Sequence, residues 1–180
     1  MNYTEIRQFD NSEVLSPKEM LWQTTVEKVN HITDRVGMPI DAGIKDTVVT
    51  LMVHGFPTSQ SCEGHPEQHD LSYPWVEIYT PEPNNWKNDE SKKETWQIEN
   101  LKQQQKMIEY LSEFYQDRKT PFEAQLCIHY IGAFGGFRIH STGAETMSLS
   151  SPTQQQEKFN LYRQEIISFS QFLKDKFFSE

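Results

Sequence analysis

The chain has 180 residues and a net charge of −9, because 26 acidic residues outnumber 17 basic ones. It contains no dense cluster of Lys and Arg, so we expect neither a nucleic-acid partner nor binding to an anionic membrane surface. Aromatic residues make up 12% of the chain, which supplies enough large side chains for the core of a single domain, residues 1–180.

The cysteine content and the lack of long apolar segments indicate where the protein resides. Two cysteines, Cys62 and Cys127, are too few for a disulfide framework in a chain of this length. The residues after Met1 lack the apolar stretch of a signal peptide, and no run of about 18 apolar residues could cross a membrane. We therefore expect a soluble protein of the reducing cytoplasm.

An amphipathic helix is predicted between Ser16 and Val36. Ser16 and Glu19 have the spacing of a capping box, in which each side chain bonds the backbone of the other residue. Apolar residues then recur at intervals of three and four residues, and Gly37 provides a stop.

A second helix is predicted from Asp41 to His54. Val48 and Val49 are β-branched, which leaves a strand as the alternative. We favour the helix because Gly55, a natural helix terminator, follows it directly.

A strand bounded by two prolines is predicted over residues 74–81. Alternation in this strand places Val76 and Ile78 on one face of a sheet and Glu77 on the other. The polar segment that follows, residues 82–93, is rich in turn formers and is expected to be a surface connection within the same domain.

A long helix is expected over residues 93–118. Its predicted buried face consists of the apolar residues Ile98, Leu101, Ile108, Leu111 and Tyr115. The three consecutive glutamines at 103–105 suit a helix and are expected to be exposed.

Residues 125–141 predict a β-hairpin. Its strands, 125–131 and 137–141, are joined through Gly135 and Gly136, which accept the positive φ of a tight turn. Apolar residues alternate along both strands and are expected to lie beneath a helix. The opposite face then carries the ionisable residues Cys127, His129, Arg138 and His140.

The register of this hairpin decides which ionisable side chains meet. Two registers preserve the alternation, because His129 can stand opposite either His140 or Arg138. In both registers a polar, ionisable patch forms across the two strands.

A last helix begins at Ser151-Pro152. Aromatic and aliphatic residues recur along it at helical spacing: Phe159, Tyr162, Ile166, Phe169, Leu173 and Phe177. We expect this stripe to cover the apolar face of the sheet, with a homodimer surface on part of it as the alternative. Together the elements predict an α+β fold, with a small antiparallel or mixed sheet and helices packed mainly on one face.

Residues 58–66 concentrate reactive groups more than any other segment, with a thiol, hydroxyls, a carboxylate and an imidazole. The pattern Thr58-x-x-Ser61-Cys62-x-Gly64-His65 resembles a segment of uncharacterised bacterial and phage proteins. It is also similar to the Ser-Cys-x-Gly segment of the wybutosine-synthesis Tyw3 family. The resemblance covers residues 55–65 and implies a turn whose backbone and small side chains face a ligand.

No activity is carried over from the Tyw3 family. His65 stands where that family has an arginine, and this chain lacks the basic surface of a tRNA enzyme.

Metal binding is one interpretation of this segment. Cys62 and His65 have the C-x-x-H spacing that can chelate zinc, and His129, His140 or His69 are the candidates to complete four ligands. The alternative is a capped turn with a buried thiol.

Nucleophilic catalysis is a second interpretation. Cys62 would act as a thiolate activated by His65 or by a hairpin histidine, with Arg138 holding an anion. The alternative is an inert thiol, because free cysteines are among the most buried residue types.

A pocket for a small anionic ligand is the interpretation that demands least of the sequence, and we rank it first. Its ligand-binding residues are Ser61, Gly64, Glu77, His129, Arg138 and His140. Arg138 would bind a carboxylate or phosphate, Gly64 would allow close backbone approach, and Ser61 would donate a hydrogen bond. The competing expectation is that Arg138 pairs with Glu77 or Glu63, leaving a salt-bridged sheet surface without a ligand.

All three functional interpretations use one arrangement. The turn from Ser61 to His65 is expected to lie over the polar face of the hairpin. Cys62 and His65 would then share one pocket with Arg138 and His140. The remaining alternative is a structural or interaction domain with no small-molecule site.

Overall fold

The computed structural model describes residues 15–66 and 73–179. Its helices are α1 (Pro17–Asn30), α2 (Lys45–Val53), α3 (Glu90–Tyr115) and α4 (Pro152–Ser179). Its strands are β1 (Thr58–Cys62), β2 (Trp75–Ile78), β3 (Leu126–Ile131) and β4 (Gly136–Ser141). Short 3₁₀ helices are η1 (Trp86–Asn88), η2 (Phe122–Ala124) and η3 (Ala144–Leu149).

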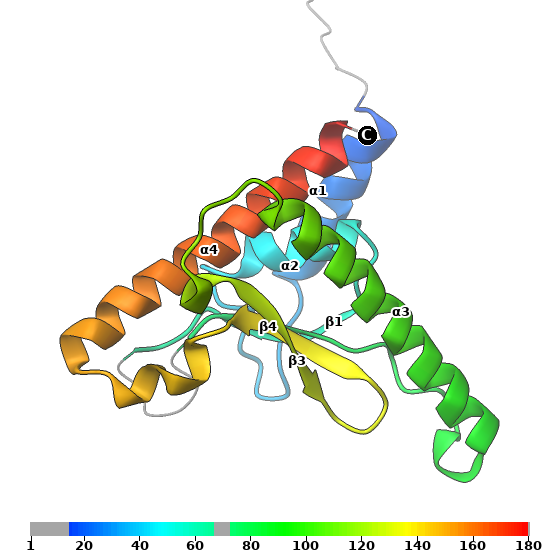
Figure 1. The fold of residues 1–180 in the computed structure, drawn as a ribbon. Coiled ribbons are helices and arrows are strands. Elements are labelled where there is room, and N and C mark those ends of the chain that lie inside the picture. Colours follow the sequence, from blue (N-terminus) through cyan, green and yellow to red (C-terminus); the bar gives the residue numbers. More distant parts are fainter. Residues whose placement is uncertain (1–14, 67–72, 180) are drawn as a thin grey trace, which may run out of the picture.

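The four strands form one sheet in the order β1-β2-β4-β3, and every neighbouring pair is antiparallel. Helices α2, α3 and α4 lie on one side of this sheet, as Figure 1 shows, and α1 packs on α2. The fold is therefore α+β, and the sheet is antiparallel rather than mixed.

The hairpin register is one of the two that the sequence allows. His129 stands opposite Arg138, and Cys127 stands opposite His140. Strand β2 pairs with the other side of β4, with Glu77 opposite Arg138 and Val76 opposite Ile139, so the same alternation of faces continues across it. The ionisable residues therefore share one face of the sheet, as the alternation predicts.

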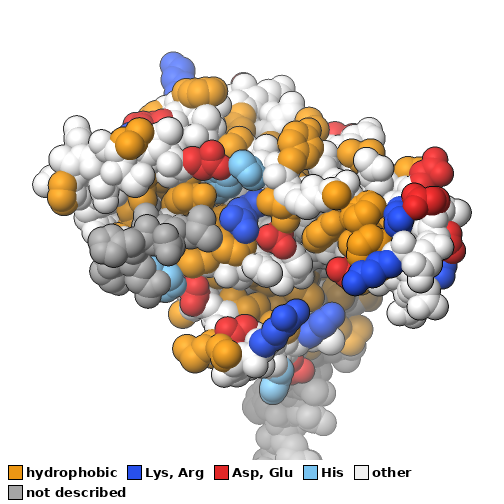
Figure 2. All heavy atoms as spheres, turned by 90° about the horizontal axis from the view of Figure 1, so that it is seen from below, with side chains coloured by type: hydrophobic (Ala, Val, Ile, Leu, Met, Phe, Trp, Pro, Cys, Tyr) orange, Lys and Arg blue, Asp and Glu red, His pale blue; other side chains and the backbone are white. Residues whose placement is uncertain are grey.

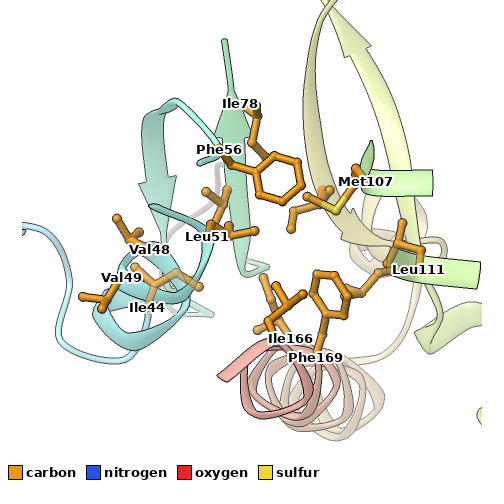
Figure 3. Packing of buried hydrophobic residues seen from close by; sticks show 14 of the residues in the cluster. Ile44, Val48, Val49, Leu51, Phe56, Ile78, Met107, Leu111, Ile166 and Phe169 are labelled. Carbon is orange, nitrogen blue, oxygen red and sulfur yellow. The ribbon is translucent and has the colours of Figure 1, made fainter. Parts of the chain in front are cut away.

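The main core lies between the apolar face of the sheet and the helices. Side chains from α2, α3, α4 and β2 converge there (Figure 3), and those labelled are Ile44, Val48, Val49, Leu51, Phe56, Ile78, Met107, Leu111, Ile166 and Phe169. Residues 45–53 form helix α2, which confirms the predicted helix over the alternative strand. Val48 and Val49 are both buried in it. The predicted stripe of α4 is also confirmed from Phe159 to Leu173.

Helix α1 ends earlier than the sequence indicates. Its capping box at Ser16 is present, but the helix stops at Asn30. The carboxylate of Asp34 accepts the backbone N–H groups of Val36 and Met38, which stabilises a turn in place of further helix. Val36, expected on the buried stripe, is 81% exposed.

The buried face of α3 differs from the predicted one. Ile98, Leu101 and Ile108 are exposed, and the helix instead buries Trp96, Asn100, Gln104, Met107, Leu111 and Phe114. The expectation that residues 103–105 are all exposed is therefore wrong for Gln104.

Hydrogen bonds explain why α3 turns two polar side chains inward. The Asn100 Oδ1 atom accepts the backbone N–H and the hydroxyl of Thr80 at 2.8 and 2.9 Å, and its Nδ2 donates to the carbonyl of Phe134 at 2.9 Å. Gln104 Nε2 donates to the carbonyl of Gly135 at 2.6 Å. These bonds fix α3 to the end of β2 and to the turn of the hairpin.

Among residues 15–66 and 73–179, no helix combines the length and the apolar character that crossing a membrane requires.

Replacing Asn100 by alanine should destabilise the fold by about 1–3 kcal/mol, because the half-buried N–H and hydroxyl of Thr80 lose their acceptor. The control is Gln105→Ala, on the exposed side of the same helix, where a surface change is expected to stay within about 0.5 kcal/mol. Urea unfolding monitored by circular dichroism measures both. Equal unfolding midpoints for the two variants would contradict the bridging role of Asn100.

Candidate functional site

The structure places four of the predicted site residues in two groups of side chains that could hold a metal ion. The histidine–glutamate group consists of His129, His140 and Glu145, and the cysteine group consists of Asp41, Cys62 and His65. Within each group the ligand atoms lie within 4.8 Å of one another. Figure 2 views the molecule from below the view of Figure 1, and histidine side chains lie beside acidic ones there.

The expected single pocket is therefore replaced by two neighbouring sites. Cys62 stands opposite Trp75 at the start of β2. Extending the register of β2 and β4 by one pair places Trp75 beside His140. The tryptophan thus separates the thiol from the hairpin histidine, on the same face of the sheet.

His140 is the buried member of the histidine–glutamate group, with 2% of its surface exposed. Its Nδ1 lies 2.9 Å from the carbonyl oxygen of Ser141. A carbonyl oxygen only accepts, so Nδ1 carries the proton and Nε2 presents a lone pair. Burial lowers the pKa of His140, which favours this neutral form.

The lone pair of His140 faces the other two members of the group. Nε2 has no hydrogen-bond partner among the residues that the structure describes, and it lies 3.9 Å from Oε1 of Glu145. The same Glu145 oxygen is 2.9 Å from Nδ1 of His129. His129 and Glu145 are about half exposed, so the group opens to solvent on one side.

Strand pairing and a short turn assemble this group. His129 and His140 are diagonal neighbours on β3 and β4, with ring centroids 5.5 Å apart. Glu145 follows β4 in η3, and the ring of Tyr73 packs against His140 at 5.2 Å. The sequence did not single out Glu145, and its closeness to His140 along the chain was the available signal.

Arg138 is held by protein groups. Its Nη2 lies 3.2 Å from Oε2 of Glu77, and its guanidinium carbon lies 3.8 Å from the ring centre of Trp75. Ser59 also donates to Glu77, at 2.8 Å. This confirms the expectation that Arg138 pairs with Glu77; Glu63, the other candidate partner, instead accepts the N–H of Gly43.

The cysteine group begins at the edge of the sheet. Residues 58–62 form strand β1, which takes in the first two residues of the turn expected from Ser61 to His65, and the chain turns only at Gly64, where φ is +85°. Ser61 stands opposite Val76, so it belongs to the face that carries the main core and not to the face of Cys62.

Asp41 completes this group from the loop before α2. Its Oδ2 atom lies 3.5 Å from Nε2 of His65 and accepts the backbone N–H of Glu63 at 3.1 Å. The sequence marked Asp41 only as a helix start. His69, a candidate fourth ligand, lies outside the described residues, and His129 and His140 belong to the other group.

The surroundings of Cys62 favour a neutral thiol. Burial raises the pKa of Cys62, and the carboxylates of Asp41 and Glu63 raise it further, against the lowering effect of a hydrogen bond from the N–H of Gly64. An activated nucleophile requires the opposite shift. The geometry therefore gives the nucleophilic interpretation little support.

Glycine is required at position 64 because a side chain would not fit there. This steric reason takes the place of the expected close approach of a ligand to the backbone. An added Cβ would lie 2.7 Å from Cε2 of Phe159 and 2.8 Å from the carbonyl carbon of Tyr73. Gly37 has a similar φ of +84°, but no atom of the described part of the chain lies within 4 Å of its Cβ position.

These two glycines form a matched pair. Gly37→Ala should cost about 1–2 kcal/mol, from the left-handed backbone alone. Gly64→Ala should cost a further 1–3 kcal/mol or so, because a side chain is forced against Phe159. Urea unfolding of both variants tests this, and equal losses would show that the contact with Phe159 is unimportant.

The state of the thiol can be tested in metal-free protein that carries Cys127→Ser, so that Cys62 is the only cysteine. We expect slow alkylation at pH 7.5 and faster alkylation in Asp41→Asn, because removing that carboxylate lowers the pKa of Cys62. Asp46→Asn, at an exposed position nearby, should leave the rate unchanged. Alkylation of the parent protein faster than that of free cysteine would instead indicate an activated thiolate.

Comparisons with known proteins give no information about function, so the evidence about function comes from the chemistry of these side chains. No protein-family model matches the chain, and searches of curated proteins and of solved structures found no match. The resemblance of residues 55–65 to the Tyw3 segment therefore stays a prediction.

Proposed function

We propose that this protein is a metal-dependent enzyme that acts on a small anionic molecule. His129, His140 and Glu145 would bind a divalent transition-metal ion. The observation that carries the proposal is the buried Nε2 of His140, which has no hydrogen-bond partner within residues 15–66 and 73–179 and faces the other two ligand atoms.

A buried polar atom without a partner costs free energy, commonly about 1–3 kcal/mol. A bound metal ion would use this lone pair and remove the cost. The bond from Nδ1 to the carbonyl of Ser141 supports the same assignment. Metal-ligating histidines typically donate their other ring N–H to a carbonyl or carboxylate, which fixes the tautomer and the ring orientation.

The donor set indicates the class of metal. Two imidazoles and one carboxylate suit zinc, iron or cobalt better than magnesium or calcium, which prefer oxygen ligands. Three protein ligands leave coordination positions open, which distinguishes catalytic sites from closed structural ones. The metal would supply Lewis-acid chemistry to a ligand in these positions.

Charge favours an anionic ligand. A divalent ion bound by one carboxylate and two neutral imidazoles keeps a net positive charge on the solvent side of the group. Arg138 does not contribute a free charge, because it pairs with Glu77. Its role in this proposal is to hold β4 against β2, so that His140 keeps its position.

The test is metal-dependent stabilisation of the folded chain. Free zinc or cobalt at about 100 times the dissociation constant stabilises a single site by about 2.7 kcal/mol, and each 1 kcal/mol raises the melting temperature by roughly 2–4 °C at this chain length. Glu145→Gln and His129→Gln should each weaken binding about tenfold or more.

The controls remove the same groups from exposed positions elsewhere. Glu157→Gln and His31→Gln should bind metal as the parent protein does. In the cobalt-loaded protein, added acetate or phosphate should change the visible absorption by entering an open position. If Glu145→Gln and His129→Gln bind metal as tightly as their controls, the proposal is wrong.

A further inference from the structure

We infer that Asp41, Cys62 and His65 form a second, separate metal site that binds zinc. This site shares no ligand with the histidine–glutamate group, so the inference does not depend on the function proposed above. It joins the loop before α2 to the end of the edge strand β1.

The ligand atoms are already gathered. The Cys62 thiol, an imidazole nitrogen of His65 and a carboxylate oxygen of Asp41 all lie within 4.8 Å of one another. Oδ2 of Asp41 is 3.5 Å from Nε2 of His65, and each side chain is about one-third exposed. Small movements of exposed side chains would bring these atoms to zinc-ligand distances of about 2.0–2.3 Å.

The backbone prepares the sulfur for a metal. The positive φ of Gly64 turns the chain back, so that its N–H donates to Sγ of Cys62 at 3.3 Å. Hydrogen bonds to a ligating sulfur stabilise its negative charge. Residues 62 and 65 then present a thiolate and an imidazole from one turn, in the spacing of a zinc half-site.

Electrostatics favour a cation at this place. The carboxylate of Asp41 lies within 4.8 Å of the thiol and the imidazole, and Glu63 directly follows Cys62 in the chain. A zinc ion would bind the thiolate and the Asp41 carboxylate together, so that these negative charges are neutralised. The soft sulfur ligand selects zinc over magnesium or calcium.

The consequence of binding is a cross-link. At present a hydrogen bond from the N–H of Glu63 to Asp41 ties the loop to the strand end. Zinc would add metal–ligand bonds between the same two segments and close the intervening loop, which contains α2. The site therefore stabilises the edge of the sheet next to Trp75.

Cobalt substitution distinguishes this site from the other. A thiolate ligand gives cobalt a near-ultraviolet charge-transfer band, whereas the histidine–glutamate group contains no sulfur. The parent protein should bind two cobalt ions per chain and show the band. Cys62→Ser should bind one ion and lose the band, while Cys127→Ser, the change at the other half-buried cysteine, should keep both.

Asp41→Asn keeps an acceptor for the N–H of Glu63 but loses the anionic ligand, so it should weaken zinc binding about tenfold or more. Asp46→Asn is the control at a nearby exposed carboxylate. Melting curves of metal-free Cys62→Ser and Asp41→Asn should match the parent closely enough to show that both variants fold.

The outcomes separate the two sites. Glu145→Gln should bind one ion and keep the band, whatever enzyme chemistry the histidine–glutamate group performs. If the histidine–glutamate group binds no metal, the parent protein should bind one cobalt ion and still show the charge-transfer band. Absence of the band from the parent, or its loss in Cys127→Ser with retention in Cys62→Ser, would overturn the cysteine site.

Discussion

The pairing of Glu77 with Arg138 is the constraint on which the central sheet depends. These residues stand opposite each other on β2 and β4, and their side chains meet at 3.2 Å with less than one-fifth of each side chain exposed. A one-residue slip between the strands would turn Arg138 into the apolar core beneath the helices, where its charge would lack a partner. The register that this pair enforces also sets His129 and His140 on one face.

The face that carries the ionisable residues is only partly open. A second hydrophobic cluster closes one end of the sheet, and its buried members are Tyr73, Trp75, Ala124, Ala144, Met147, Phe159 and Tyr162. The N-terminal half of α4 contributes to this cluster, while its C-terminal half packs in the main core. His140 lies at the boundary, against Tyr73, which gives one imidazole a buried environment beside two exposed ligands. The proposed metal site would therefore combine a buried ligand with access to solvent, because it lies where a small core ends.

Local patterns predict much of this fold but only parts of its sites. Alternation over a few residues determined the hairpin faces, and helical spacing determined the stripe of α4, because both depend on near neighbours in sequence. The face of α3 could not be predicted in this way, since Asn100 bonds Thr80, two residues after β2, and Phe134 in the hairpin turn. Asp41 and Glu145 come from a loop and a short helix with no periodicity, so their meeting with the predicted histidines required the fold.

The place of Trp75 has an optical consequence. The other tryptophans lie in separate aromatic clusters, with Trp22 against the end of α4 and Trp86 beside Trp96 near the hairpin turn. Trp75 alone packs between the cysteine edge and the hairpin histidine, with its ring under the guanidinium of Arg138. Its indole emission would therefore respond to open-shell ions on either side through quenching. The other three would report on the end of α4 and on the aromatic cluster near the hairpin turn. A chain that kept only this tryptophan would carry a built-in fluorescent reporter between its two groups of ligands.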